Sequence, residues 1–377
     1  MTALPDWQSE SMPPSQAARR PAPGFREFIQ ILTDRGNLVR VTEPVHWQYD
    51  LGRRTRAAGR PILFENIEDY PGSRVFANGL WSPGAIRLAL GLGFDMPREA
   101  FLAEARKRIA HPIPPRVIES GPVLENILEG DAVNLLDLPV PQWHDRDAGR
   151  YLGTWHLNIT RDPETGARNV GVYRMQLLGP RQATVSTSQR SHLALQMAGA
   201  ERAGQPLPMA VVIGVSEPLL MAAAAGFPGG MDELELAGGL LQQPVEVIRS
   251  QPNGLELPAQ AEIAIEGVIL PGVRVQDGPY FDYAGTPSTN SRALLFEAQR
   301  LLFRSNPIFR GASVGMPGAE DHQLLAFLAG MNLVNFHGSA SRRVMQNLLF
   351  RTRHFSALQW VDRINRKTLM RFLRKPA

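Results

Sequence analysis

The sequence predicts an α/β protein of the α+β type, in which a mixed N-terminal unit precedes a strand-rich barrel or sandwich. Two observations support this prediction. Helical and strand-like patterns are mixed between residues 25 and 115, whereas short apolar runs separated by turn signals dominate beyond residue 150. Helical patterns return after Glu320, and they end the chain.

The N-terminal stretch, residues 1–24, is polar and rich in Pro, so we expect a flexible arm, no signal peptide and a cytoplasmic protein. In FREFIQILTDRG, from Phe25, apolar residues recur at helical spacing, and Gly36 is suited to end the helix. NLVRVTEPV and PILFENI are typical of strands, and IRLALGLG of a short helix. We place the N-terminal domain at residues 25–118.

A linker rich in Pro and Asp leads into a run of short strands. The strand candidates are GTWHLNIT, RNVGVYRMQLLG, QATVSTS, MAVVIGV, VEVIRS and AEIAIEGVIL. Two helical segments interrupt them, one near Pro218–Ala225 and one at MDELELAGGLLQQ. We assign residues 119–318 to this domain and residues 319–377 to a helical, basic C-terminal segment.

Composition excludes several kinds of chemistry. Apolar residues make up 44% of the 377 residues, which is sufficient for a packed core. There is no cysteine, which excludes disulfides, zinc–thiolate sites, iron–sulfur clusters and a thiol nucleophile. A metal ion would therefore be held by His, Asn, Asp or Glu.

The positive charge of the chain is concentrated at its end. Residues 342–377 contain ten Lys or Arg and one acid, a net charge of +9, which leaves −5 for the rest of the chain. We therefore expect no nucleic-acid-binding face on the main body. Glu217, Pro218 and Gly226 interrupt the most apolar stretch, so we also expect no membrane span.

Three polar clusters are candidates for a metal or substrate site. The first contains Asn169 and Arg174, which would point to opposite faces of a regular strand unless Gly171 introduces a bend. The second contains His192 at the start of a helix, and the third contains Glu233 in the first turn of a helix. Taken singly, these patterns are also typical of exposed strand residues, a surface histidine and a helix start that favours acids.

The fourth cluster, QDGPYFDYAG, contains Asp277 and Asp282. Gly278 and Pro279 predict a turn, which would let both carboxylates face one cavity. Neighbouring carboxylates separate each other's pKa values, and one of them can then donate a proton at neutral pH. Aspartates that cap a turn would give the same pattern.

Taken together, the clusters predict more than they do singly. Asn169, His192 and Glu233 form an O/N/O ligand set that suits Mn²⁺ or Mg²⁺. Arg174 with two nearby carboxylates could hold a substrate carboxylate and move a proton.

The order and spacing of these motifs resemble the UbiD family of decarboxylases. The resemblance is carried by NVGVYRMQ, SHLALQM, MDELELAG, LELPAQAEIAIEGVI and DGPYFDYAG, and also by FREFIQILTDRGNLVRVTEPV and PILFENIEDYPGSRV. It covers roughly residues 25–325. The end of the chain does not resemble the family's C-terminal domain, which completes the cleft and drives oligomerisation.

The resemblance implies a split β-barrel similar to flavin reductases that binds prenylated FMN, with Mn²⁺ and a monovalent cation such as K⁺ nearby. By motif, Asn169, His192 and Glu233 match the metal ligands and Arg174 the substrate-carboxylate anchor. Asp277 and Asp282 match the two acids, and Asp282 takes the proton-donor position. The implied cofactor contacts are Thr154, Asn169, Val172, Tyr173, Arg174, His192, Pro228 and Glu233.

The implied activity is reversible, non-oxidative decarboxylation of an aromatic or α,β-unsaturated acid. Loss of carbon dioxide from an sp² carbon needs an electron-sink cofactor, while the protein orients the substrate and supplies a proton. A flavin prenyltransferase would supply the cofactor, and we expect a homo-oligomer. The alternatives are a cofactor-binding but inactive or regulatory relative, and an FMN-binding protein of the flavin reductase type.

Overall fold

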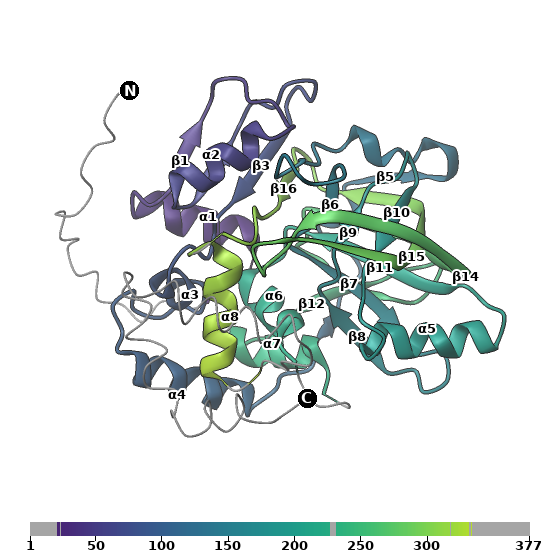
Figure 1. Ribbon diagram of the computed structural model, residues 1–377. Coiled ribbons are helices and arrows are strands. Elements are labelled where there is room, and N and C mark those ends of the chain that lie inside the picture. Colours follow the sequence, from purple (N-terminus) through teal and green to yellow (C-terminus); the bar gives the residue numbers. More distant parts are fainter. Residues whose placement is uncertain (1–20, 23, 227–230, 317, 332, 334–377) are drawn as a thin grey trace, which may run out of the picture.

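The structure is a computed structural model that describes residues 21–22, 24–226, 231–316, 318–331 and 333 (Figure 1). Two main β-sheets, two smaller ones of three and two strands, and the helices packed between and around them form its described part. A small N-terminal sheet lies beside a larger, strongly curved sheet. Several helices gather below the small sheet and against one face of the large one. This arrangement agrees with the predicted α+β class.

The N-terminal unit contains a mixed four-stranded sheet with strand order β1-β2-β3-β16. Pairs β1–β2 and β3–β16 are parallel, and β2–β3 is antiparallel. The elements of this unit are α1 (Phe25–Asp34), β1 (Val39–Val41), α2 (Asp50–Ala58), β2 (Ile62–Phe64), β3 (Arg74–Ala77), α3 (Pro83–Ala89), α4 (Arg98–Ile109) and β16 (Ile308–Arg310).

Helix α1 confirms the predicted periodicity. Its apolar residues Phe25, Phe28, Ile29 and Leu32 are all buried, and Gly36 follows the helix in the left-handed conformation. The fourth strand of the small sheet was not expected, because β16 comes from residues 308–310, after the large sheet. The chain therefore returns to its N-terminal unit, and the two sheets are tied together.

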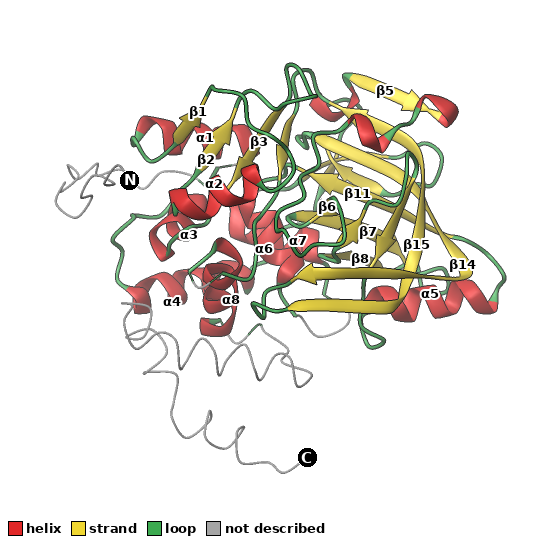
Figure 2. Cartoon of the chain, turned by 45° about the horizontal axis from the view of Figure 1, so that its top comes forward, coloured by secondary structure: helices red, strands yellow, loops and turns green. Residues whose placement is uncertain are grey.

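The large sheet has seven strands in the order β10-β15-β14-β11-β7-β8, with β5 added on β15, and every pairing in it is antiparallel. Figure 2 shows how the long strands β14 and β15 curve across it. The strands are β5 (Asn126–Glu129), β7 (His156–Arg161), β8 (Arg168–Gly171), β10 (Gln182–Val185), β11 (Leu207–Ile213), β14 (Ile263–Phe281) and β15 (Pro287–Phe303).

Strand β11 shows why its sequence is continuously apolar. Met209, Val211 and Ile213 face the core enclosed by the curved sheet. Ala210 and Val212 face the second core, which the helices cover. Because side chains alternate along a strand, burial on both faces requires an unbroken apolar run.

The remaining elements complete the large domain. They are β4 (Arg116–Val117), η1 (Pro122–Leu124), η2 (Gly130–Ala132), η3 (Leu135–Asp137), β6 (Tyr151–Gly153), β9 (Met175–Gln176), α5 (His192–Arg202), α6 (Glu217–Ala224), α7 (Glu233–Leu241), β12 (Glu246–Arg249), β13 (Glu256–Pro258) and α8 (Glu320–Gly330). The predicted helices near 218–225 and at MDELELAGGLLQQ correspond to α6 and α7.

One local prediction was wrong. Gly278 and Pro279 do not form a turn, because β14 continues through them to Phe281 and the chain reverses only at residues 282–286. The ladder is irregular at this point, since three steps along β14 from Asp277 to Tyr280 correspond to two along β15. The Gly–Pro pair thus marks a β-bulge inside a strand.

A buried ionic cluster joins the two parts of the molecule. Arg310 of β16 is fully buried and donates to Glu217 at 3.0 Å and to Glu320 at 2.5 Å and 3.0 Å. Glu320 also accepts the backbone N–H groups of Asn78 and Leu80. The cluster therefore fixes the N-terminal unit, α6 and α8 to one another.

In the described part of the chain, no helix is long and apolar enough to cross a bilayer. Helix α8 corresponds to the predicted helix HQLLAFLAGM. The rest of the predicted C-terminal segment, residues 334–377 with its basic tail, lies outside the described residues, as does most of the predicted N-terminal arm.

Candidate active site

A bend after β8 creates the site. The strand ends at Gly171, and residues 172–174 leave the ladder before β9 begins at Met175. The backbone N–H of Tyr173 donates to the Asn158 side-chain oxygen at 3.0 Å, which holds the bend. The expected bend is therefore present, and it lets Asn169 and Arg174 serve different parts of one site.

Gly171 is required at this bend by lack of space. A Cβ at this position would lie 2.6 Å from the Tyr173 ring and 2.8 Å from its hydroxyl oxygen.

We expect Gly171→Ala to displace Tyr173 and to lower stability by about 1–3 kcal/mol, the usual cost of overpacking. Thermal unfolding measures this. Gly179→Ala is the matched control, because a Cβ there meets nothing within 4 Å. Equal melting temperatures for the two variants would contradict the prediction.

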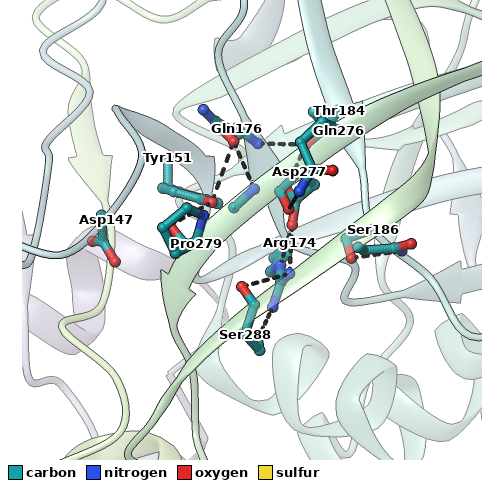
Figure 3. A network of polar contacts seen from close by, with 12 residues as sticks. Asp147, Tyr151, Arg174, Gln176, Thr184, Ser186, Gln276, Asp277, Pro279 and Ser288 are labelled. Carbon is teal, nitrogen blue, oxygen red and sulfur yellow. Dashed lines mark hydrogen bonds and ion pairs between the residues drawn. The ribbon is translucent and has the colours of Figure 1, made fainter.

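Arg174 and Asp277 form the centre of the site (Figure 3). The Arg174 Nε donates to Asp277 Oδ1 at 2.6 Å, and Nη2 lies 2.5 Å from the same oxygen. The Asp277 side chain is fully buried, whereas that of Arg174 keeps 17% of its surface exposed. The pair thus has an inner carboxylate and a guanidinium that solvent can reach.

Two residues that the sequence did not single out complete this pair. Thr184 of β10 donates its hydroxyl to Asp277 Oδ2 at 2.7 Å, and the Ser288 hydroxyl of β15 accepts from Arg174 Nη1 at 2.6 Å. The Arg174 guanidinium also lies over the Tyr280 ring, 5.2 Å from its centroid. These residues come from distant strands, and neither Thr184 nor Ser288 lies in a recognisable motif.

Asp282 lies elsewhere in this structure. Its carboxylate accepts the backbone N–H of Ala284 at 2.8 Å, inside the turn that joins β14 to β15. The side chain is partly exposed, and no contact with Arg174 is recorded for it among the described residues. The expectation that both carboxylates approach Arg174 therefore holds for Asp277 and not for Asp282 in this conformation. The reason is that the chain reverses after Phe281 and not at Gly278.

The candidate metal ligands lie next to this bend. Glu233 opens α7, is 6% exposed, and accepts the backbone N–H of Val170 at 3.1 Å. The neighbouring residue Asn169 is buried, with its amide nitrogen donating to Thr160. Burial raises the pKa of Glu233 to about 7, because a desolvated carboxylate is costly to ionise.

The Tyr173 hydroxyl connects the three candidate ligand segments. It lies 3.5 Å from Asn169 Oδ1, and its surroundings include Ser191 and the backbone of Leu193, on either side of His192, together with the charge of Glu233. His192 itself is exposed at the first residue of α5. The three segments therefore approach one another around Tyr173.

The donor set fits a hard divalent cation. An amide oxygen, an imidazole nitrogen and a carboxylate oxygen suit Mn²⁺ or Mg²⁺. Glu233 has no ion pair among the described residues, because the nearby Arg168 pairs with Asp232 at 2.6 Å. A bound cation would therefore compensate the buried charge of Glu233. Within the described ranges, no group of three or more His, Cys, Asp and Glu is placed to hold a metal ion, and this set contains only two such residues.

Comparison with protein families assigns both parts of the chain. Residues 116–317 match the Rift-related domain of 3-octaprenyl-4-hydroxybenzoate carboxy-lyase, UbiD, and residues 29–109 match the N-terminal domain of the same family. The chain belongs to the UbiD family. The UbiD resemblance predicted from the motifs is therefore confirmed.

Curated relatives in this family carry decarboxylase names. The pyrrole-2-carboxylic acid decarboxylase of Pseudomonas aeruginosa is 33% identical over 337 residues, and the match covers 84% of this chain and 66% of the relative. The phenolic acid decarboxylase of Bacillus subtilis is 32% identical over 308 residues, covering 78% and 65%. The chain thus spans 66% and 65% of the length of these two UbiD relatives.

Solved UbiD structures share the fold. The vanillic acid decarboxylase of Sedimentibacter hydroxybenzoicus, in closed form, superposes with a TM-score of 0.78 at 29% identity, covering 81% of this chain and 67% of the other. An evolved dimeric form of the UbiD-class enzyme HmfF from Pelotomaculum thermopropionicum, in complex with prFMN, gives 0.76 at 27% identity, covering 87% and 82%.

Two of the three remaining cofactor contacts implied by the UbiD resemblance lie among the described residues. Thr154 is buried and accepts the backbone N–H of Ala312 at 3.0 Å. Val172 lies in the bend itself and packs against the helix-covered core. Pro228 lies outside the described residues.

Proposed function

We propose that this chain decarboxylates an aromatic or α,β-unsaturated carboxylic acid with prenylated FMN and a divalent metal ion, preferably Mn²⁺. The observation that supports this most is the Arg174–Asp277 pair beside the Asn169, His192 and Glu233 segments in a chain of the UbiD family. The decarboxylase names of the relatives and the prFMN complex of HmfF support the same conclusion.

Arg174 would anchor the substrate carboxylate. Its Nε and Nη2 are directed to Asp277, and Nη1 donates to the Ser288 hydroxyl, which leaves a second N–H on Nη1. Because the guanidinium is partly exposed and Asp277 is not, an incoming carboxylate meets the arginine first. A planar guanidinium binds carboxylates with a defined orientation, which suits a substrate that must lose this group.

The metal ligands and the bend would hold the cofactor. Asn169, His192 and Glu233 would supply the divalent ion's ligands, and Tyr173 lies beside Asn169. On the UbiD resemblance, the Val172 backbone and Thr154 would contact the cofactor. When bound, prenylated FMN supplies an electron sink for the electron pair that remains after carbon dioxide departs. Pro228 and a nearby K⁺ complete the cofactor site that we propose on the UbiD resemblance.

Asp282 would then deliver a proton to the carbon that lost the carboxylate. Within the described part of the chain, its carboxylate bonds to the backbone N–H of Ala284, and the side chain is partly exposed, so solvent can reach it. Asp277 is less suited to this step, because both of its oxygens already accept hydrogen bonds from Arg174 and Thr184.

The proposal also covers the type of barrel, the source of the cofactor and the oligomeric state. We propose that the curved sheet is the split barrel of flavin reductase type that the family resemblance implies. We further propose that a flavin prenyltransferase supplies the cofactor and that the enzyme acts as a homo-oligomer.

Co-expression with a flavin prenyltransferase tests the proposed function. We expect the purified chain to carry prenylated FMN, identified by its mass and spectrum, and to release carbon dioxide from at least one member of a panel of aromatic and acrylic acids. Bound cofactor without carbon dioxide release would instead favour an inactive relative. Absence of both flavin and turnover would contradict the proposal.

Glu233→Ala tests the metal site. We expect the variant to lose most of its bound Mn²⁺ and, with it, much of its flavin, because the metal ion would help to hold the cofactor in this proposal. Metal analysis and flavin absorbance of purified protein measure both. Glu235→Ala is the matched control, since Glu235 lies two residues further along in the same first turn of α7. Parental metal and flavin content in Glu233→Ala would remove it from the ligand set.

A further inference from the structure

The end of strand β14 is held not only by β15 but also by a second part of the chain. Between Asp277 and Tyr280 the ladder with β15 is irregular, and the segment that carries the two candidate acids leaves regular pairing. The end of a strand at a bulge is free to take a new direction, but something else must then fix it.

The loop between residues 141 and 151 and strand β9 supply further contacts. Figure 3 labels Asp147 of this loop and Gln176 of β9, together with Asp277 and Pro279 of β14. Phe281 donates its backbone N–H to Asp147 Oδ1 at 2.8 Å, and Pro279 accepts the backbone N–H of Ala148 at 2.7 Å. The backbone N–H of Gly278 donates to the Gln176 side chain at 2.9 Å. Three polar backbone groups of the segment therefore bond to this loop or to β9.

Asp147 is the residue in this loop that bridges the two segments. Its Oδ2 accepts the backbone N–H of His144 at 3.0 Å, while Oδ1 accepts that of Phe281. The His144 ring packs on the Phe281 ring, with centroids 4.5 Å apart. One buried carboxylate thus binds one backbone N–H from the loop and one from the strand end, and a pair of rings reinforces the contact.

We propose that Asp147 is a positioning residue that fixes the β14 end, and through it sets where Asp277 and Asp282 lie relative to Arg174. Phe281 directly precedes Asp282, so the bond to Asp147 is the last one before the candidate donor. On the other side, Asp277 lies four residues before Phe281 and pairs with Arg174. This inference rests on the proposed function.

The charges around Asp147 agree with this role. Burial raises the pKa of Asp147 to about 6, while the two backbone N–H groups and Arg56 of α2 act in the opposite direction. The other titratable groups that face it are Asp145, Tyr151 and Tyr280, with His144 beside it. Keeping a carboxylate here costs free energy, and an apolar residue could not accept both N–H groups.

Asp147→Asn tests the proposal, because asparagine has nearly the same shape but only one accepting oxygen. We expect hydrogen–deuterium exchange in residues 277–283 of the full chain to become at least about fivefold faster, since losing one of two backbone contacts costs about 1 kcal/mol. The rest of β14 and the thermal midpoint should change little. Asp145→Asn is the matched control, as it removes the same charge from an exposed position two residues away.

Turnover of the cofactor-loaded protein gives the second measurement. We expect Asp147→Asn to lower kcat on the order of 10-fold, because small displacements of reacting groups have large effects on rate. KM should change less than kcat, since Asp277 keeps its direct contacts with Arg174 and Thr184, and flavin content should stay at the parental value. A role confined to stability would lower the amount of folded protein but would not separate kcat from KM in this way.

The pH dependence distinguishes the carboxylate from its neighbours. Above about pH 6 Asp147 is ionised and accepts both N–H groups, whereas protonation below that value turns one oxygen into a donor. Local protection of residues 277–283 should therefore fall as pH decreases through about 6 in the parent and not in Asp147→Asn. Burial lowers the pKa of His144 to about 4, and the pKa values of Tyr151 and Tyr280 are raised, so these groups do not titrate in that range.

The two measurements fail in different ways. Parental exchange in residues 277–283 of Asp147→Asn would overturn the positioning role, whatever the turnover. Faster exchange with parental kcat would also overturn it, because the strand end would then move without consequence for the reaction. If the loaded parent shows no turnover, the proposed function fails, while the exchange measurement still decides whether Asp147 fixes the Asp277–Asp282 segment.

Discussion

Replacing Arg174 with alanine should lower kcat/KM by roughly 30- to 3,000-fold, the range expected when one member of a buried charged pair is truncated. The loss has two sources. The substrate carboxylate loses its anchor, and the fully buried Asp277 loses the guanidinium that approaches its Oδ1 to 2.5 Å. Steady-state kinetics on an accepted substrate, with flavin content checked separately, measures the first effect.

The second effect is on stability and can be separated from the first. Removing one partner of a buried ion pair costs roughly 3–5 kcal/mol, because an uncompensated charge stays in the interior. Replacing both partners with apolar residues of similar size, as in Arg174→Met with Asp277→Leu, should recover much of that stability without restoring activity. Denaturant unfolding of the single and double variants measures this difference.

Arg174→Lys provides a sharper version of the same test. Lysine keeps the charge but not the planar group that contacts Asp277 and Ser288 together. We expect it to fold better than the alanine variant and still to bind substrate poorly, seen as a raised KM. Parental KM in Arg174→Lys would show that the site needs only a positive charge, and the anchoring role would be contradicted.

Much of the fold could be predicted from local patterns. The helix that begins at Phe25 and the helix after Asp232 have clear apolar spacing or a capping residue, and both are present. Helix α2 was missed, because DLGRRTRAA is mostly polar and only Leu51, Gly52 and Thr55 are buried. Helix α4 was missed as well, since the apolar residues of REAFLAEARKRI show little helical periodicity.

The site was predictable where a motif kept its residues close in sequence. Gly171 signalled the bend that separates Asn169 from Arg174, and the structure contains that bend. Contacts between distant strands gave no such signal. Thr184 and Ser288 contact the Arg174–Asp277 pair only because the sheet brings β10 and β15 together, which no local pattern encodes.

The Gly–Pro pair in DGPYFDYAG shows how a correct residue preference can lead to a wrong prediction of local structure. Glycine and proline favour turns, but they are also accepted at bulges, where a strand loses its regular pairing. Here the loop containing Asp147 replaces that pairing, and this contact is invisible in the local sequence. The chain reverses at residues 282–286 and not at Gly278, and Asp282 therefore lies in the turn.

Asp282→Asn should slow decarboxylation by about 10²- to 10⁴-fold, the usual contribution of a general acid. The substitution leaves the local structure intact, because an asparagine oxygen can accept the backbone N–H of Ala284 as the aspartate does. It removes only the transferable proton. Metal and flavin content should therefore equal those of the parent, and substrate binding should change little, since Arg174 is untouched.

Isotope exchange distinguishes this step from carbon dioxide release. The parent should exchange the product hydrogen with deuterium from solvent, because the donor exchanges its proton with water, whereas Asp282→Asn should lose this exchange. Asp277→Asn is the informative comparison. It weakens the contact that orients Arg174, so its main effect should be a raised KM together with reduced stability.

The position of Asp282 in the structure makes the test decisive. Among the described residues, its carboxylate bonds to the backbone N–H of Ala284 in its own turn, so it must rotate toward the substrate to act. Asp277, in contrast, is buried and accepts from two partners, which suits an orienting role better than a proton donor. Near-parental turnover and exchange in Asp282→Asn would exclude Asp282 from proton transfer. Asp277 would then have to give up its contact with Thr184 or Arg174 in order to deliver the proton.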